Sequence, residues 1–407
     1  MWLAILFLGL AFFVVHAFYF SARLKRAFTL VLPRTRRWLG PLRAAYLVVA
    51  LSVPALFLGY LVYALIAQPE TTGPPDSRVY DYLIEIPFWL LTITSLQSSL
   101  LIIPIDLIHL AMARFGIAAG PRWERRRAAL VLGVVAAAAV YVPIRIAVDM
   151  TGLDVRVHDY TSAELPAALD GLEIALIADM QADQFTRPKR LSQLVDAANR
   201  ARPDLVLIAG DMITRAPRHI EIAAEQTARL RAPLGVFACI GDHDNFAYRD
   251  RARSLREVRD ALARRGVPML DNEVREFRVG DSRIAVIFAT NNYVSRVDRA
   301  TTRSLLARSA GADLRVLLSH QPGAELVADA HTGGVELFLS GHTHGGQVNF
   351  WLPFFDVTPV GFESRYISGS YHLGDMLLVV SNGLGMSIAP FRYRAPATLD
   401  LIRLHRP

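Results

Sequence analysis

Two histidines stand one residue apart in the segment LSGHTHGGQ (residues 339–347), and glycines flank them on both sides. The apolar run VELFLS leads directly into this segment and has the length of a buried strand. Neutral imidazole is a common metal ligand, and glycine allows the backbone to approach a bound group closely. The sequence therefore predicts a tight turn after a strand that presents His342 and His344 to a metal site.

Four other strand-like runs also end in polar residues that can bind metals. They are followed by ADMQAD (178–183), GDMI (210–213), GDHDN (241–245) and SHQP (319–322). A single aspartate after a strand is usually a turn or helix cap, but five such ends would meet at the carboxyl edge of an α/β sheet, where binding crevices form. The candidate residues are Asp179, Gln181, Asp211, Asp242, His243, His320, His342 and His344.

Three carboxylates with several imidazoles form a mixed oxygen and nitrogen ligand set, which suits Mn²⁺, Fe or Zn²⁺. The candidates are too numerous for one ion. Two ions about 3.5–4 Å apart, bridged by a carboxylate and a hydroxide, would use them all. Such a pair binds a phosphate group and stabilises the charge of an in-line displacement. We therefore expect two divalent metal ions and phosphoryl chemistry.

The elements that must position these residues lie after about residue 150. Short β-branched and leucine-rich runs alternate there with helix-like segments, such as residues 187–201 and 253–265. This alternation predicts a layered α/β domain in which the sheet is buried between helices.

The first 150 residues have a different texture. Four apolar stretches, at about 2–20, 42–67, 86–112 and 128–144, are long enough to cross a bilayer as helices. The first has neither the basic start nor the cleavage site of a signal peptide. We expect a membrane domain with four transmembrane helices at residues 1–149 and a catalytic domain at residues 150–407.

The distribution of charge indicates the orientation of these spans. The loops after the first and third stretches hold 12 basic residues and one acid, whereas the loop at 68–81 holds one basic and three acidic residues. Short basic loops stay in the cytoplasm, so the catalytic domain is expected on the extracytoplasmic side of a bacterial cytoplasmic membrane. The two basic loops together carry a charge of 12 − 1 = +11, whereas the whole chain carries +7, so the rest of the chain is net acidic. We therefore expect no nucleic-acid partner.

The remaining polar candidates are weaker. Cys239 is the only cysteine, which excludes an internal disulfide, and its apolar neighbours indicate a buried side chain. Gln97, Asp106 and His109 lie within the third stretch and mark either a polar pathway or, for the last two, the inner membrane face. The other five histidines outside the membrane stretches are expected to be ordinary surface or loop residues: His158, His219, His331, His372 and His405.

The order and spacing of these blocks resemble the calcineurin-like metallophosphoesterase superfamily, whose blocks read D-x-H, G-D, G-N-H-[DE], H and G-H-x-H. The resemblance covers about residues 170–400. GHTHGGQ together with SNGLGMSIAPFRYRAP (381–396) is most similar to the membrane-associated YkuE/YaeI-like branch. The resemblance implies a calcineurin-like β-sandwich flanked by helices and a hydrolase of phosphate esters, either a monoesterase or a phosphodiesterase.

The resemblance also implies a role for each candidate. Asp179, Gln181 and His344 would bind the first metal, and Asp211 would bridge the two metals. Asp242, His320 and His342 would bind the second metal. His243 would lie over the phosphate and stabilise or protonate the leaving oxygen, so His243 and Asp211 are the expected catalytic residues.

Two positions depart from the family pattern. Gln181 replaces the histidine of D-x-H, and Asp242 replaces the asparagine of G-N-H-D. Because the resulting site is richer in oxygen, we predict a preference for Mn²⁺ or Fe over Zn²⁺. Asp183 either replaces Gln181 as a ligand or is a solvated loop acid. The same departures allow a second interpretation, in which the first metal site has weakened.

The segment VNFWLPFF (348–355) follows the metal turn and contains four aromatic residues. It predicts either a lid that enters the lipid interface or holds acyl chains, or a hairpin packed on the domain. The preferred function is therefore a membrane-anchored phosphoesterase that acts on phospholipid or lipid-linked substrates. The alternative is a membrane transporter or sensor with a catalytically weakened phosphoesterase-like binding domain.

Overall fold

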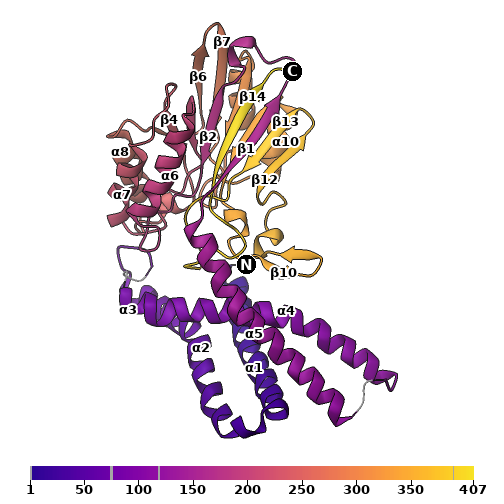
Figure 1. The fold of residues 1–407 in the computed structure, drawn as a ribbon. Helices are drawn as coiled ribbons and strands as arrows, with labels where there is room; N and C mark the ends of the chain where they lie inside the picture. The colour runs from indigo at the N-terminus through magenta and orange to yellow at the C-terminus, as the bar shows by residue number, and fades with distance from the viewer. Residues whose placement is uncertain (1, 74–76, 118–119, 388) are drawn as a thin grey trace. The chain divides into compact units, whose positions relative to one another are not determined.

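The computed structural model describes residues 2–73, 77–117, 120–387 and 389–407 (Figure 1). Residues 74–76 of the acidic loop, residues 118–119 of the second basic loop and Ile388 of the C-terminal motif lie outside this description. The chain divides into two compact units. The helical unit comprises residues 1–68, 74–148 and 350–357, and the sandwich unit comprises residues 69–73, 149–349 and 358–407.

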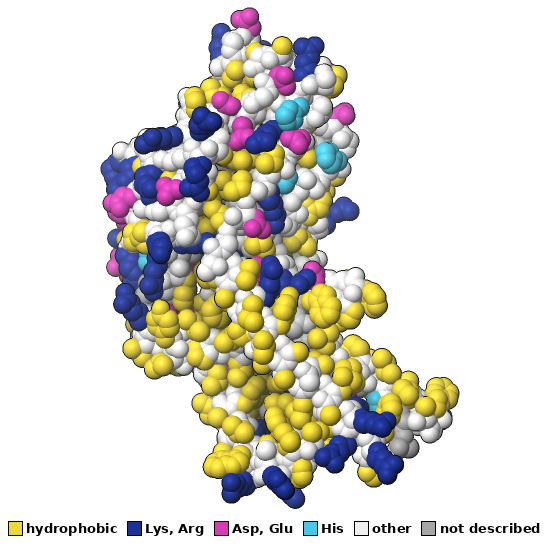
Figure 2. Space-filling view, viewed as in Figure 1, with side chains coloured by type: hydrophobic (Ala, Val, Ile, Leu, Met, Phe, Trp, Pro, Cys, Tyr) yellow, Lys and Arg dark blue, Asp and Glu magenta, His cyan; other side chains and the backbone are white. Residues whose placement is uncertain are grey.

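Four long helices dominate the helical unit: α1 (Trp2–Val31), α2 (Arg36–Ala67), α4 (Ile86–Arg114) and α5 (Pro121–Thr151), of which α5 continues into the sandwich unit. Each predicted apolar stretch lies inside one of them. All four are long and apolar enough to cross a membrane, so the prediction of four long apolar helices is confirmed. Figure 2 shows that hydrophobic side chains cover much of this unit. Shorter turns lie between the long helices: η1 (Pro33–Thr35), α3 (Arg78–Tyr80) and the π-helical η2 (Asp81–Glu85).

Polar contacts join the helices of this unit at their basic ends. Arg23 of α1 makes a two-pronged hydrogen bond to the Asp106 carboxylate of α4, at 2.9 and 2.8 Å. Arg26 of α1 pairs with Glu124 of α5 at 3.2 Å, and His109 Nε2 lies 3.4 Å from the same carboxylate. The ends of α1 and α4 and the start of α5 therefore lie together. Asp106 and His109 lie at this basic end of the unit and contact its charged side chains.

The sandwich unit contains two six-stranded sheets. The first has the order β1 (Asp154–Thr161), β14 (Thr398–His405), β2 (Glu173–Ile177), β3 (Leu205–Ile208), β4 (Val236–Cys239) and β5 (Met269–Leu270). The second has the order β12 (Gly369–Leu373), β13 (Met376–Val380), β9 (Leu337–Ser340), β8 (Leu314–Leu318), β7 (Ser282–Phe288) and β6 (Glu273–Val279). Strands β2 to β5 are mutually parallel, as are β7, β8, β9 and β13.

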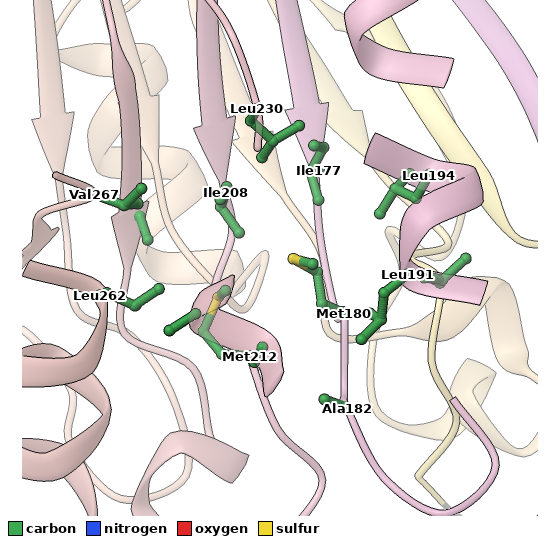
Figure 3. Packing of buried hydrophobic residues seen from close by; sticks show 14 of the residues in the cluster. Ile177, Met180, Ala182, Leu191, Leu194, Ile208, Met212, Leu230, Leu262 and Val267 are labelled. Atoms are coloured by element: carbon green, nitrogen blue, oxygen red, sulfur yellow. The ribbon is translucent and has the colours of Figure 1, made fainter. Parts of the chain in front are cut away.

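Helices cover the outer faces of both sheets. Helices α6 (Pro188–Ala201), α7 (Arg218–Thr227) and α8 (Arg251–Ala263) pack on the first sheet, and α9 (Arg299–Ser309) and α10 (Ala324–Thr332) pack on the second. Figure 3 shows Leu191 and Leu194 of α6 facing Ile177 of β2. The neighbouring Leu176 lies instead in the core between the sheets. The strands are therefore buried on both faces, which explains their continuous apolar runs, and the predicted β-sandwich flanked by helices is confirmed.

The aromatic segment after the metal turn forms a two-stranded hairpin of β10 (Phe350–Leu352) and β11 (Phe355–Val357). By its packing the hairpin belongs to the helical unit. Two hydrogen bonds join the hairpin to α4. The Gln97 side-chain amide donates to the Trp351 carbonyl at 2.8 Å and accepts from the Trp351 N–H at 3.0 Å. Gln97 thus pairs with the backbone of β10.

Candidate metal centre

The predicted ligands lie in the loops that leave the carboxyl ends of the strands. Asp179 and Gln181 follow β2, Asp211 follows β3, and Asp242 with His243 follow β4. From the second sheet, His320 follows β8, and His342 and His344 follow β9. Their short 3-10 turns are η4 (His243–Asn245) and η5 (His344–Gly346). Both sheets therefore contribute residues to one edge of the sandwich.

Asp242, His320 and His342 form the first group that could hold a metal ion. One donor atom from each lies within 4.8 Å of the other two. Asp242 Oδ2 is 3.2 Å from His320 Nε2 and 3.0 Å from His342 Nδ1. The structure thus brings together the three residues expected at the second metal.

Asp179, Asp211 and His320 form a second group within the same limit, so His320 belongs to both groups. Gln181 lies beside this group, and its Nε2 donates to Asp211 Oδ2 at 3.2 Å. His344 Nε2 is 3.7 Å from Asp179 Oδ1. The residues expected at the first metal are therefore also close together.

Two acceptor atoms in this cluster have no hydrogen-bond partner among the described residues. Asp179 Oδ1 and Gln181 Oε1 are both buried and unpaired. A buried acceptor without a partner is costly, and a divalent cation would satisfy both atoms. The orphaned oxygens, together with the carboxylates and imidazoles around them, fit a pair of divalent metal ions.

The charges of the cluster perturb several pKa values. Burial raises the pKa of Asp179 to about 6, and the Asp211 carboxylate adds to this effect. Burial opposes the charged form of His342, but hydrogen bonds to Asp242 and Glu363 outweigh it and raise the pKa of His342 to about 9. Burial and the Arg392 guanidinium hold the pKa of His344 well below its usual range.

Five of the seven expected ligands adopt a left-handed backbone: Asp179 (φ 48°), Gln181 (40°), Asp211 (56°), His342 (73°) and His344 (52°). This conformation is unfavourable for residues with a side chain and concentrates at functional sites. The turn requires glycine at position 341 because its backbone lies close to the Asp179 side chain: a Cβ on Gly341 would lie 2.5 Å from Asp179 Oδ2. The backbone is thus strained where the ligands are presented.

His243 is held by two backbone-mediated contacts. Its Nδ1 donates to the Thr214 carbonyl at 2.6 Å, and its backbone N–H donates to Asp211 Oδ1 at 2.7 Å. Because Nδ1 carries the proton of this hydrogen bond, Nε2 is the nitrogen available to a substrate oxygen.

A cavity of about 420 Å³ adjoins this cluster on the His342 side. Its wall includes Tyr293, Gln321 and Glu363. Gln321 Nε2 donates to Asp242 Oδ2 at 2.9 Å, so the wall of the cavity contacts a candidate ligand directly.

Several supporting residues were not predicted from the sequence. Asp244 is fully buried and accepts from the backbone N–H groups of Asp211, Met212 and Gly241, at 3.1, 2.8 and 2.8 Å. Asp244 is the fourth residue of the segment GDHD (241–244), so this motif could have indicated a carboxylate that binds the backbone of the loop. Nothing in the local sequence marks Glu363, which reaches His342 from a distant loop. Arg392 lies in the segment SNGLGMSIAPFRYRAP, but that motif did not indicate its contact with the His344 carbonyl.

Three expectations about polar residues outside the ligand set were wrong. Asp183 is buried rather than solvated, because its carboxylate accepts from the N–H groups of Phe185 and Thr186 and from Thr214 Oγ1. His158 and His219 are not surface residues. His158 contacts the buried Asp400 at 2.8 Å, and His219 lies in the inner face of α7. Cys239 is buried as predicted, and burial raises its thiol pKa.

The sandwich and its cluster have the arrangement expected of a calcineurin-like phosphoesterase domain. Residues 172–346 match the family model described as calcineurin-like phosphoesterase. The chain therefore contains a calcineurin-like phosphoesterase domain, and the predicted enzyme class is confirmed.

Named relatives agree with this assignment. The chain is 27% identical over 252 residues to the uncharacterized metallophosphoesterase YkuE of Bacillus subtilis, covering 61% of this chain and 84% of that protein. It is 25% identical to the phosphodiesterase YaeI of Escherichia coli, covering 52% of this chain and 75% of that protein. It is 26% identical to a Danio rerio protein named transmembrane protein with metallophosphoesterase domain, covering 69% of this chain and 63% of that protein, which is less than two thirds of its length.

Proposed function

We propose that this protein is a membrane-anchored, dinuclear metal-dependent hydrolase of phosphate esters. The observation that carries the proposal is the pair of donor groups that share His320, with ligand atoms inside 4.8 Å in each group. Calcineurin-like phosphoesterases typically bind divalent metals, and this chain has residue groups that could hold them.

The two groups and the neighbouring Gln181 and His344 support the ligand roles that the family resemblance implies. Asp242, His320 and His342 would hold one ion, and Asp179, Gln181 and His344 would hold the other, with Asp211 between them. Two divalent cations supply phosphate charge neutralisation and a water of lowered pKa when bound. The Gln181 oxygen is a harder donor than the imidazole it replaces, and the Asp242 carboxylate adds a negative charge where the family pattern has a neutral amide. Both departures favour Mn²⁺ or Fe, with Zn²⁺ possible.

His243 and Asp211 are the proposed catalytic residues. The His243 ring is held at Nδ1 by the Thr214 carbonyl, so a second proton at Nε2 can be donated to the leaving oxygen. Asp211 orients the same residue, because its Oδ1 accepts from the His243 backbone N–H. Together they would place a proton donor next to the carboxylate that lies between the metals.

Membrane association is supported by the four apolar helices. We propose that residues 1–149 form the membrane domain and that residues 150–407 act on the extracytoplasmic side of a bacterial cytoplasmic membrane. The clustering of Arg23, Arg26 and Arg127 at one end of the helical unit supports this orientation.

The exposed hairpin supports a phospholipid or lipid-linked substrate. Trp351, Phe354 and Phe355 are 41%, 94% and 62% exposed, and the hairpin packs in the unit that holds the apolar helices. Exposed aromatic side chains of this kind suit a membrane interface.

The test is hydrolysis of bis-p-nitrophenyl phosphate and p-nitrophenyl phosphate by the full chain in detergent, with Mn²⁺, Fe²⁺ or Zn²⁺ added separately to chelator-treated protein. His243→Gln should lower kcat by about 100-fold or more, since general acid–base groups contribute about 10²–10⁴-fold. Asp211→Asn removes the carboxylate charge proposed to lie between the metals and should also lower kcat by about 100-fold or more. Retained Mn²⁺ binding with no hydrolysis would favour the alternative of a transporter or sensor with a binding domain.

The lipid substrate requires its own comparison. Phe354→Ser with Phe355→Ser should lower activity on phospholipid vesicles by about 10-fold, because two aromatic side chains no longer enter the interface. Activity on the soluble ester should stay unchanged. Val155→Ser, at a 50% exposed position of β1, is the control and should change neither activity. Equal loss on both substrates would contradict the lipid-interface role.

A further inference from the structure

Glu363 makes a contact with the metal turn that none of the expected ligand roles explains. It lies directly after η6 (Pro359–Phe362), and its Oε1 is 3.0 Å from His342 Nε2. The Tyr293 hydroxyl donates to the same oxygen. The carboxylate is thus held between a candidate ligand and a neighbouring phenol.

The two nitrogens of His342 face different partners. Nε2 faces Glu363, whereas Nδ1 is 3.0 Å from Asp242 Oδ2 and 3.3 Å from His320 Nε2, inside the first donor group. A neutral imidazole carries one proton and has one lone pair. A metal can therefore bind at Nδ1 only when the proton resides at Nε2.

Both neighbouring carboxylates attract that proton. Asp242 alone would draw it to Nδ1, where it would block the lone pair. Glu363 offers a competing acceptor on the far side of the ring and favours Nε2–H. Carboxylates that accept from a ligating histidine in this way fix its tautomer and ring orientation.

Tyr293 connects the two sides of this arrangement. Its backbone N–H donates to Asp242 Oδ1, its hydroxyl donates to Glu363, and its ring packs edge-on against the His342 ring with centroids 5.2 Å apart. Although the Glu363 side chain is 44% exposed, its contacts with Tyr293 and His342 restrict its position.

We propose that Glu363 is a positioning residue for the metal centre: it holds His342 with Nδ1 free to bind a divalent cation, and Tyr293 holds Glu363 in place. The proposal rests on the proposed dinuclear function. It assigns Glu363 an action through His342 and no contact with substrate.

The test is Mn²⁺ binding to the full chain in detergent, measured by equilibrium dialysis after chelator treatment. Glu363→Ala should weaken one Mn²⁺ site by about 10- to 100-fold, the usual effect of removing such a partner. Glu363→Gln keeps an acceptor oxygen and should lose less. Glu325→Ala is the control, because Glu325 lines the same cavity at 83% side-chain exposure and should leave binding unchanged.

A double-mutant comparison separates positioning from a general structural effect. If Glu363 acts through His342, adding Glu363→Ala to His342→Ala should cause no further loss of Mn²⁺ affinity. Metal-free Glu363→Ala should stay folded by far-ultraviolet circular dichroism and lose only the stability that the Glu363 hydrogen bond to His342 gives the wild type. Tyr293→Phe should cause a smaller loss of the same sign.

Two results would overturn the proposal. One is wild-type Mn²⁺ affinity in Glu363→Ala, and the other is an equal loss in the presence and absence of His342. Failure of the proposed function has a different signature, in which the wild-type chain binds Mn²⁺ with the predicted dependence on Glu363 but hydrolyses no phosphoester.

Discussion

Arg392 is a fully buried cation that holds the loops around the metal turn. Its guanidinium donates to the carbonyls of Asn382 and Gly385 at 2.7 Å each, and to those of Ala395 (3.0 Å), Gly383 (3.1 Å) and His344 (3.1 Å). Burial lowers its pKa to about 10, so it remains charged at neutral pH. Arg392→Met fills similar volume and removes every one of these donors.

The size of the effect follows from the carbonyls left behind. The Gly383 carbonyl keeps a hydrogen bond from Thr398 N–H, and the His344 carbonyl keeps one from Gln347 N–H. In the described part of the chain, Asn382, Gly385 and Ala395 have no other donor. Each buried carbonyl without a partner costs about 1–3 kcal/mol. Because relief from burying a cation offsets part of this cost, we expect a net loss of about 3–5 kcal/mol.

Hydrogen–deuterium exchange of the full chain in detergent measures this loss locally. Amides in residues 381–387 and 343–349 should lose protection by about 100-fold or more, since about 1.4 kcal/mol corresponds to a factor of ten. Arg403→Met is the control, because Arg403 is 47% exposed and makes an ion pair with Glu173 that is worth about 0–1 kcal/mol. Wild-type protection of both segments in Arg392→Met would refute the reasoning.

Three further predictions concern the cluster and the hairpin. The pKa values of Asp179 (about 6), His342 (about 9) and His320 (well above its usual range) are raised, so stability that is present in acid is lost as pH rises through them. The lowered pKa of His344 acts in the opposite direction, because its contribution to stability is lost as pH falls. Since the raised groups outnumber it, the melting temperature of the metal-free protein should fall from pH 5 to pH 8, and Mn²⁺ should restore it; a flat profile would contradict this. Gln181→His should shift metal selectivity toward Zn²⁺ in competition dialysis, because imidazole is the softer donor; unchanged selectivity would refute it. Gln97→Leu removes both hydrogen bonds to Trp351, at a cost of about 1–3 kcal/mol. It should speed chymotryptic cleavage of the hairpin about 10-fold. An unchanged cleavage rate would show that Gln97 does not hold the hairpin.

The sequence was informative where the signal is local. Apolar stretches of sufficient length predicted the four long helices, and polar residues after apolar runs predicted which loops carry Asp179, Asp211 and His320. These features depend on neighbouring residues along the chain, so they can be read without the fold. Helix α8 was also found, although it begins at Arg251 rather than residue 253, because Asp250 caps it by accepting from the Arg253 N–H.

The supporting contacts could not be predicted, because they join residues far apart in the sequence. Glu363 reaches His342 across 21 positions, Arg392 reaches His344 across 48, and Gln97 reaches Trp351 across 254. The residues next to a charged or amide side chain in the sequence are the same whether that side chain is solvated or buried against a distant loop. Asp183 illustrates the error, since only the fold reveals the three donors that surround its carboxylate.

Contacts between residues far apart in the sequence also bear on whether residues 150–407 form an independent domain, which remains a prediction. Segment 69–73 packs in the sandwich unit, where Thr71 forms a β-bridge with Tyr248 and the Glu70 carbonyl accepts from the Arg249 N–H at 2.9 Å. These contacts lie a few residues after His243. A fragment that starts at residue 150 loses them, so exchange of residues 246–253 should be about 10-fold faster in the fragment than in the full chain, the equivalent of one or two backbone hydrogen bonds. Replacing residues 69–73 by glycine and serine in the full chain should reproduce the effect, because the loss then stems from this segment rather than from truncation. Equal exchange in all three proteins would show that the sandwich unit needs nothing from the first 149 residues.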